Sequence, residues 1–196
     1  MKLHTLILAS TSPRRKELLR QLEVEFETIP ADVAEAEHDF LTASELAQIN
    51  AYRKARAISK KHPDALVLGM DTVVSLGATL FGKPSNLDQA EEFLVQLQGK
   101  THQVVTGVCL IHLRSHHQKT FTDMTDVTFR SLNPKEIRHY LSKINPLDKA
   151  GGYAIQEHGD DIVRSVSGSF SNVVGLPIEK LRSELEHLKI EIAQFA

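Results

Sequence analysis

Residues 10–16 combine hydroxyl groups with three positive charges, a mixture that can bind phosphate. Ser12 is a suitable N-cap and Pro13 suits the first helical position, so a helix is predicted to begin here. Arg14 and Arg15 then lie in its first turn, where cations oppose the helix dipole and destabilise the helix slightly. That cost is explained if an anion binds there, because helix N–H groups and guanidinium groups together hold phosphate. The alternative is a solvated basic helix start, and the spacing does not match a P-loop.

Asp71 directly follows an apolar run at residues 65–70, which is typical of a buried strand. Open α/β sheets bind their ligands beyond strand ends, so a carboxylate at the end of this strand can hold a divalent cation or act as a general base on water. The alternative is an aspartate that only caps the strand or makes a turn.

Lys83 stands between Gly82 and Pro84, where a rigid turn can direct its ammonium group toward a phosphate. The alternative is an exposed turn lysine. This segment becomes a candidate only in combination with the others.

Residues 148–156 place an acid, a base, two glycines and an amide in one short loop. Asp148 and Lys149 come first, and the loop ends with Gln156. Paired glycines let a backbone approach a ligand closely. We favour a functional loop over a decorated hairpin, because many polar groups here precede an apolar segment.

The segments between these candidates predict alternating strands and helices in the first half of the chain and a long hairpin in the second. That order predicts an α/β fold with a mixed sheet and helices on both faces. A capping box at residues 42–45 opens a helix expected to turn Leu46, Ile49, Ala51, Ala55 and Ile58 inward. The predicted strands are residues 5–9, 24–29, 65–70 with an extended continuation to 76, 101–113, 119–129 and 162–166. The predicted helices are residues 14–22, 42 to about 62, 86–99, 133–144 and 177 onward, and residues 31–41 are predicted to form a loop.

The composition is that of an ordinary globular protein. Because its net charge is slightly negative, it can bind an anion only through a local cluster of basic residues. The chain has 196 residues, 41% of them hydrophobic and 24% charged, with a net charge of -2. No global positive field therefore attracts DNA, RNA or an anionic membrane. The single cysteine, Cys109, lies in an apolar run and is predicted to be a buried core residue, which agrees with a reducing compartment. Residues 1–9 are too short for a signal peptide or a membrane span, so we expect a cytoplasmic protein without a nucleic-acid or membrane partner.

Other catalytic patterns are absent from the sequence. The ten histidines are scattered without zinc-ligand spacing, and no Gly-x-Ser-x-Gly elbow occurs.

Taken in order, the polar segments resemble the motifs of the Maf family of nucleoside triphosphate pyrophosphatases. The resemblance spans nearly the whole chain. It departs at Met70, where the family often has a smaller residue, and at Ala34, where an acid often precedes Glu35. The matching pieces are residues 8–15, Glu35, Lys54 with Ala55, residues 69–74, residues 82–84, His102 with Thr106, residues 148–156 and residues 173–177.

This resemblance implies a single domain over residues 1–196, built as an elongated mixed sheet with two lobes around a central cleft. It also implies a divalent metal cation, Mg²⁺ or Mn²⁺, a homodimer, and Asp71 as the proton acceptor. The function it implies is hydrolysis of a nucleoside triphosphate to the monophosphate and pyrophosphate, a nucleotide-pool house-cleaning reaction.

Base specificity is expected from Arg14, Thr72 and Gln156, because the branch of the family that takes dTTP and UTP carries Arg, Thr and Gln at these places. The branch that takes 7-methyl-GTP tends to carry an aromatic residue, Gln and Glu. Gln156 offers both a donor and an acceptor, which suits the O4 and N3–H edge of thymine or uracil. The alternatives are a 7-methyl-GTP pyrophosphatase and a non-catalytic nucleotide-binding regulator of cell division.

The resulting hypothesis places the triphosphate across the cleft, with cations neutralising the charge that develops as pyrophosphate leaves. Glu35 and Asp71 are expected to gather round the metal, while Asp71 polarises the attacking water and Arg14 adds a further phosphate contact. The residues expected to hold phosphate are Ser10, Ser12, Arg15, Lys54, Lys83 and Lys149.

Overall fold

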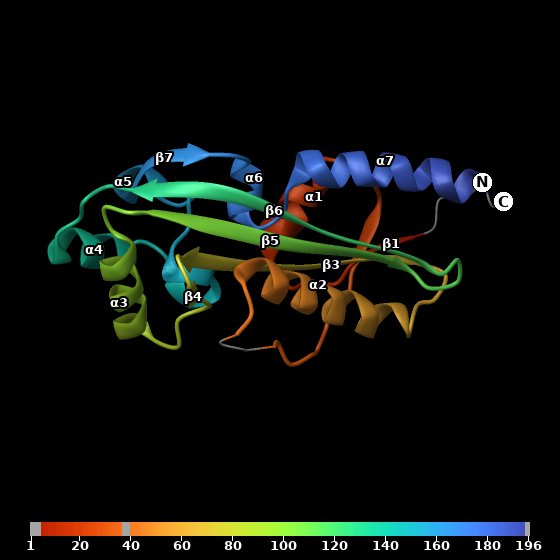
Figure 1. The fold of residues 1–196 in the computed structure, drawn as a ribbon, viewed down its shortest axis with the longest axis horizontal. Helices are drawn as coiled ribbons and strands as arrows, with labels where there is room; N and C mark the ends of the chain where they lie inside the picture. Colours follow the sequence, from red (N-terminus) through yellow and green to blue (C-terminus); the bar gives the residue numbers. More distant parts are fainter. Residues whose placement is uncertain (1–4, 37–39, 195–196) are drawn as a thin grey trace.

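The computed structural model describes residues 5–36 and 40–194, which form an elongated α/β structure around one seven-stranded mixed sheet (Figure 1). The strand order is β2-β1-β3-β5-β6-β7, and β4 pairs with β3 off this path. β1 is parallel to β2 and to β3, and the other pairs are antiparallel. The strands are β1 Leu6–Leu8, β2 Phe26–Thr28, β3 Leu66–Leu76, β4 Thr79–Phe81, β5 Thr101–His112, β6 His117–Phe129 and β7 Val163–Ser167. The helices are α1 Pro13–Arg20, α2 Ala43–Ser59, α3 Leu87–Leu97, α4 Pro134–Leu141, α5 Gly159–Ile162, α6 Phe170–Val174 and α7 Ile178–Gln194, with short 3-10 turns η1 Pro146–Asp148 and η2 Ala150–Gly152.

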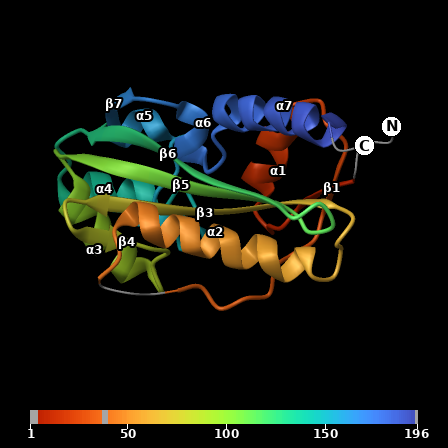
Figure 2. The same cartoon turned by 45° about the vertical axis from the view of Figure 1, so that its right-hand side comes forward.

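Helices cover both faces of the sheet, which confirms the predicted fold class (Figures 1 and 2). α2 packs on one face in a cluster that includes Val67 and Cys109. α1 and α7 pack on the other face in a cluster that includes Leu68 and Leu110. Successive residues of a strand point to opposite faces, so each long strand supplies both clusters.

Two glycines let α2 lie very close to the sheet. A Cβ atom on Gly69 would lie 2.6 Å from the backbone nitrogen of Ala55, and one on Gly107 would lie 2.7 Å from that of Gln48. Only glycine fits such approaches. The facing side of α2 carries small residues, and Ala51 and Ala55 are fully buried there.

This close approach also explains one wrong prediction about α2. Ile49, predicted to point inward, is 38% exposed, whereas Asn50 is only 3% exposed. The sheet side of the helix has room for alanine and for a hydrogen-bonded asparagine, and the larger side chain lies outside.

The predicted extended continuation to residue 76 is confirmed, but the predicted end of the strand at Asp71 is wrong, because β3 is one strand that continues through Asp71 to Leu76. On one edge, β3 pairs with β5 from Leu66 to Ser75. On the other edge, β1 pairs with β3 only up to Leu68, and β4 pairs only from Val74. What ends near Asp71 is therefore the neighbouring strand, and residues 69–73 form an edge that neither β1 nor β4 covers.

Most predicted helix starts are confirmed by their caps. The hydroxyl of Ser12 accepts from the backbone nitrogen of Arg15 at the start of α1, and Asn86 caps α3. Thr42 and Glu45 form the predicted capping box of α2. The sequence reading did not anticipate the short elements β4, α5 and α6, nor the two 3-10 turns.

Two separate apolar clusters lie along the face of the sheet covered by α1 and α7. One contains Met70 and Val108 together with α1 and α7. The other contains Val74 and Val104 together with α3 and α4. Between them, β3 and β5 present a paired Thr72 and Thr106 instead of apolar side chains. A polar zone therefore interrupts the core at the level of the uncovered edge.

Cys109 is a buried core residue, as predicted, and burial raises the pKa of its thiol. Within residues 5–36 and 40–194, no helix has both the length and the apolar character needed to cross a bilayer.

Candidate active site

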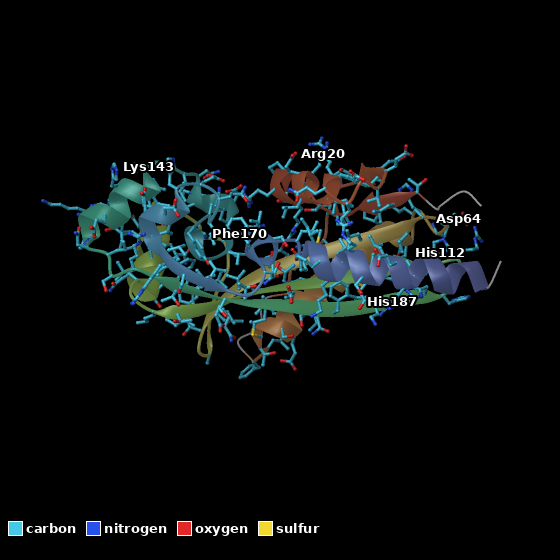
Figure 3. The ribbon with its side chains drawn as sticks, turned by 90° about the horizontal axis from the view of Figure 1, so that it is seen from above. Arg20, Asp64, His112, Lys143, Phe170 and His187 are labelled. Carbon is cyan, nitrogen blue, oxygen red and sulfur yellow. The ribbon has the colours of Figure 1, made fainter. Side chains whose placement is uncertain are left out.

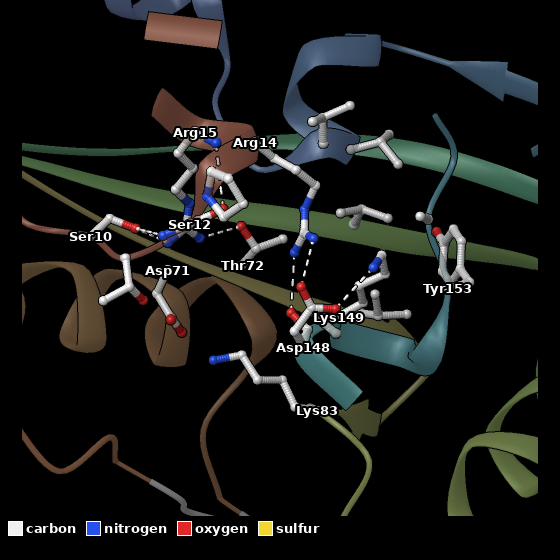
Figure 4. Close-up of a pocket in the computed structure, with 18 of the residues that line it drawn as sticks. Ser10, Ser12, Arg14, Arg15, Asp71, Thr72, Lys83, Asp148, Lys149 and Tyr153 are labelled. Atoms are coloured by element: carbon white, nitrogen blue, oxygen red, sulfur yellow. Dashed lines mark hydrogen bonds and ion pairs between the residues drawn. The ribbon is translucent and has the colours of Figure 1, made fainter. Parts of the chain in front are cut away.

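A pocket of about 520 Å³ opens at the uncovered edge of β3 (Figure 4). Apolar side chains line one part of it, including Leu147, Tyr153 and Val173. Every residue predicted for the site lines the same pocket, although the residues come from distant parts of the chain. They are Ser10, Ser12, Arg14, Arg15, Glu35, Lys54, Asp71, Thr72, Lys83, Lys149 and Gln156.

Asp71 lies at the polar end of the pocket, where it shares a cation with a second carboxylate. Nζ of Lys54 is 2.6 Å from Oδ1 of Asp71 and 2.6 Å from Oε1 of Glu35. Burial opposes ionisation of Glu35, but the hydrogen bond and the charge of Lys54 outweigh it, so the pKa of Glu35 is lowered. The two carboxylates therefore converge on a single cation position.

Asn50 completes this group, although the sequence analysis did not identify it. Its Nδ2 donates to Oδ2 of Asp71 at 3.3 Å, and its Oδ1 accepts from the backbone nitrogen of Ala36 at 2.7 Å. Asn50 thus fixes Asp71 and also holds the segment that carries Glu35. Its spacing of four residues from Lys54 places both on one face of α2, a signal that could have revealed it.

Arg15 joins α1 to the open edge of β3. Its Nη1 donates to the carbonyl of Met70 at 3.1 Å, and its Nη2 donates to Oγ1 of Thr72 at 2.9 Å. Its Nε donates to the carbonyl of Gly175 at 2.9 Å. Burial lowers the pKa of Arg15, and the nearby Asp71 opposes that effect. Because four of its five N–H groups are engaged, counting a 3.5 Å contact with Ser10, the guanidinium mainly holds the pocket wall together.

The hydroxyl of Thr72 belongs to an ordered chain of hydrogen bonds. Thr106 donates to the carbonyl of Asn172 at 3.1 Å, so it must accept the hydrogen of Thr72, which lies 3.0 Å away. Thr72 in turn accepts from Arg15. Its hydrogen is therefore committed within the protein, and a lone pair remains for other partners.

Arg14 crosses the middle of the pocket. Figure 4 shows it between a polar group that includes Ser10 and Asp71 and the ring of Tyr153. Its guanidinium donates to the side chain and to the backbone carbonyl of Asp148. Arg14 thus separates a polar half around Ser10 and Asp71 from a half that holds the ring of Tyr153 and other apolar side chains beside Lys149.

Lys83 and Gln156 are exposed on the pocket wall, as is Glu35. The ammonium of Lys83 points toward Asp71 in Figure 4, and its charge contributes to the lowered pKa of Glu35. Its loop is attached to the 148–156 segment, because the backbone nitrogen of Gly151 donates to the carbonyl of Gly82 at 2.9 Å. The side chains of Lys83 and Gln156 are therefore accessible to a ligand in the pocket.

Comparison with known proteins identifies the family of the chain. Residues 5–188 match the family model described as Maf-like protein. The chain belongs to the Maf family.

Several curated Maf relatives cover nearly the full length. The chain is 43% identical over 187 residues to a protein of Bacillus cereus strain B4264, covering 95% of this chain and 97% of the relative. It is 46% identical over 189 residues to one of Phocaeicola vulgatus, covering 94% and 96%. It is 45% identical over 181 residues to one of Myxococcus xanthus, covering 92% and 91%. Each of these relatives is named dTTP/UTP pyrophosphatase.

A solved structure shares the fold of this Maf chain. The structure of a HAM1 protein from Coxiella burnetii superposes with a TM-score of 0.53 at 14% sequence identity, covering 94% of this chain and all of the other. At that identity the likeness concerns the fold alone.

Two residues that carry the resemblance to the Maf family lie behind the pocket wall and support it. Thr106 holds Thr72, as described above, and His102 holds Tyr153 through a 2.8 Å contact between Nε2 and the phenol oxygen. Burial lowers the pKa of His102 to about 4, so its ring is neutral at physiological pH. Burial also raises the pKa of Tyr153, which therefore stays protonated.

The carboxylates of the Maf site fit a divalent cation completed by substrate oxygens. Among the residues that the structure describes, no group of three His, Cys, Asp or Glu side chains gathers as a ready metal cage. Mg²⁺, however, is commonly bound through one or two carboxylates together with substrate phosphates and waters. Glu35 and Asp71 already converge on the ammonium of Lys54, so this pair of oxygens fits such an ion.

Proposed function

We propose that this Maf protein hydrolyses dTTP and UTP to the monophosphate and pyrophosphate, as a house-cleaning reaction of the nucleotide pool. The observation that carries the proposal is that relatives from three genera, each 43–46% identical over more than nine tenths of the chain, are named dTTP/UTP pyrophosphatase. The pocket supports it, since it pairs a cationic polar half with an apolar half suited to a base.

We place the triphosphate in the polar half. Lys83 and Lys54 offer ammonium groups there, and the start of α1 adds the hydroxyls of Ser10 and Ser12. Arg15 has one N–H group left for a phosphate oxygen. The contacts of Lys149 favour support of the neighbouring Asp148 over direct phosphate binding, because its ammonium already donates to Asp148 and to the carbonyl of Asn145.

Asp71 is proposed as the proton acceptor. Water attacks the α-phosphorus, its proton passes to the Asp71 carboxylate, and the bond to the β-phosphate bridging oxygen breaks to release pyrophosphate. Asn50 fixes the carboxylate for this step. The cations around it offset the negative charge that builds up on the departing pyrophosphate.

A divalent cation, Mg²⁺ or Mn²⁺, is proposed to be held by Glu35 and Asp71 together with phosphate oxygens of the substrate. When bound, such an ion polarises phosphoryl oxygens and neutralises their charge. Lys54 would then move off the shared position between the two carboxylates.

Base choice is proposed to depend on Arg14, Thr72 and Gln156. Gln156 is exposed on the pocket wall and can pair with the O4 and N3–H edge of thymine or uracil. Thr72 acts through Arg15, because its hydroxyl oxygen accepts a hydrogen bond from the guanidinium of that residue. Arg14 lies between the two halves of the pocket, where base and phosphates join.

We further propose a single domain over residues 1–196 whose two lobes are the two ends of the sheet, each with its own apolar cluster. The nucleotide would bind between them. A homodimer and a cytoplasmic location are proposed as well, the first from the resemblance to the family and the second because a free buried cysteine suits a reducing compartment.

The test is to incubate the purified protein with dTTP, UTP, CTP, GTP and 7-methyl-GTP in the presence of Mg²⁺ or Mn²⁺ and to measure released pyrophosphate. The proposal expects dTTP and UTP to be the best substrates. Preference for 7-methyl-GTP would assign the protein to the other branch, and binding without pyrophosphate release would leave a nucleotide-binding regulator.

A further inference from the structure

Asp148 makes the most extensive contact with Arg14 in the pocket. Nη1 of Arg14 donates to Oδ2 of Asp148 at 2.9 Å, and Nη2 donates to the backbone carbonyl of the same residue at 3.1 Å. The contact joins the first turn of α1 to η1, segments separated by 134 positions in the chain. The side chain of Arg14 is 18% exposed and that of Asp148 is 46% exposed, so the arginine end of this ion pair is the more buried one.

Lys149 holds the other oxygen of the same carboxylate. Its ammonium donates to Oδ1 of Asp148 at 2.9 Å and to the carbonyl of Asn145 at 2.7 Å, and Glu157 lies 3.5 Å away. Lys149 is only 5% exposed. Burial opposes ionisation of Asp148, but hydrogen bonds from Lys149 and Arg14 outweigh it and lower the pKa of Asp148.

The order of contacts therefore runs from a buried lysine through a carboxylate to the arginine at the centre of the pocket (Figure 4). Asp148 uses two of the five N–H groups of Arg14, and within the described part of the chain the other three are left for a ligand. A guanidinium held at two points has a fixed plane, so those remaining donors have fixed directions.

We propose that Asp148, held by Lys149, is a positioning residue that orients Arg14 and thereby contributes to the choice of base. The proposal rests on the proposed function, because it concerns the same site and reaction. An arginine already held in place loses little freedom on binding, and its directed donors favour a base whose acceptors match them. A free arginine would reach the acceptors of several bases and discriminate less.

A simpler role for Asp148 makes the opposite prediction. If the carboxylate only competes with the triphosphate for Arg14, its removal strengthens the binding of every nucleotide alike. The two roles are separated by comparing substrates and not by the activity on a single one.

The experiment measures kcat and KM of the metal-loaded enzyme for dTTP, UTP, CTP and GTP, in wild type and in Asp148→Asn. The substitution keeps the shape of the side chain but removes the charge shared by Arg14 and Lys149. We expect kcat/KM for dTTP and UTP to fall roughly tenfold, the effect of one charge-assisted hydrogen bond. The fall should come mainly from KM, and the preference for dTTP over CTP and GTP should shrink by a similar factor.

Asp64→Asn is the control, because Arg114 also makes a two-point contact with an aspartate, here with both carboxylate oxygens of Asp64 at 2.7 and 3.0 Å. Asp64 lies at one end of the molecule and does not line the pocket (Figure 3). This control should leave the preference unchanged. Asp148→Glu restores the charge and should recover part of the preference, and it carries the same test should Asp148→Asn fail to fold.

A double variant tests whether Asp148 acts through Arg14. With Arg14→Lys already present, adding Asp148→Asn should change the dTTP preference little further, since the guanidinium that Asp148 orients is already absent. Equal scaling of all four substrates, tighter binding of all four, or additive losses in the double variant would overturn the proposal. If wild type fails to hydrolyse dTTP, the proposed function fails; if it hydrolyses dTTP but the variants keep its preference, only this inference fails.

Discussion

The ammonium of Lys54 lies 2.6 Å from the carboxylate of Asp71, the residue proposed as the base. The same ammonium reaches Glu35, so one cation holds together two acidic groups from different segments. Without it, two carboxylates facing one position would repel each other. The ammonium of Lys54 therefore holds Glu35 and Asp71 together until a metal ion or another cation offsets their negative charge.

The close approach of α2 to the sheet gives a prediction about stability. Gly69→Ala should destabilise the protein by about 1–3 kcal/mol, the usual cost of overpacking a close contact. The added Cβ would collide with the backbone of Ala51 and lie 2.6 Å from that of Ala55. Denaturant unfolding measures the change. Gly82→Ala is the control, because nothing lies within 4 Å of its added Cβ. Equal stability of the two variants would contradict the close packing of α2.

Gln156→Glu tests the base-reading role of that side chain. The variant should lower kcat/KM for dTTP and UTP, because an ionised Glu cannot donate to O4 of the base, and a base oxygen enclosed in the complex without a partner costs about 1–3 kcal/mol. A guanine-type substrate should be harmed less, since Glu accepts from guanine N–H groups. The measurement is kcat/KM for dTTP, UTP, CTP, GTP and 7-methyl-GTP. Equal scaling of all five would remove Gln156 from base recognition.

Removal of the divalent cation should abolish hydrolysis. The physical reason is that Glu35 and Asp71 add negative charge beside an anionic substrate, and a cation is needed to offset both. The check is to measure pyrophosphate release after exhaustive EDTA treatment and again after adding back Mg²⁺ or Mn²⁺. Activity that survives EDTA, or orthophosphate as the first product, argues against this role.

Local signals in the sequence predicted much of the fold. Hydroxyl and amide caps at Ser12 and Asn86 marked helix starts because capping depends on residues only a few positions apart. The strand pattern predicted that the chain stays extended past Asp71, but it placed the end of the strand there, because the open edge is created by where β1 and β4 end. Which strand lies beside which is a tertiary property and leaves no local mark.

The candidate site was predictable as a set of residues but not as a set of contacts. The ordered motifs named the pocket residues, yet Asn50 was missed since an asparagine among alanines on α2 has no catalytic pattern of its own. The pairing of Arg14 with Asp148 links segments far apart in the chain, which no periodicity reveals. Likewise, Arg15 and Lys149 could be identified as cations, but the partners that occupy them could not.

The replacement of Asp71 by asparagine tests the central claim most directly. Asn keeps the shape and can still contact Lys54, but it cannot accept a proton, so kcat for dTTP should fall on the order of 10²–10⁴-fold. Binding of dTTP, measured by calorimetry, should persist, and Asp64→Asn serves as an active control. A purified, folded Asp71→Asn protein that turns over dTTP at the wild-type rate would show that Asp71 is not the base.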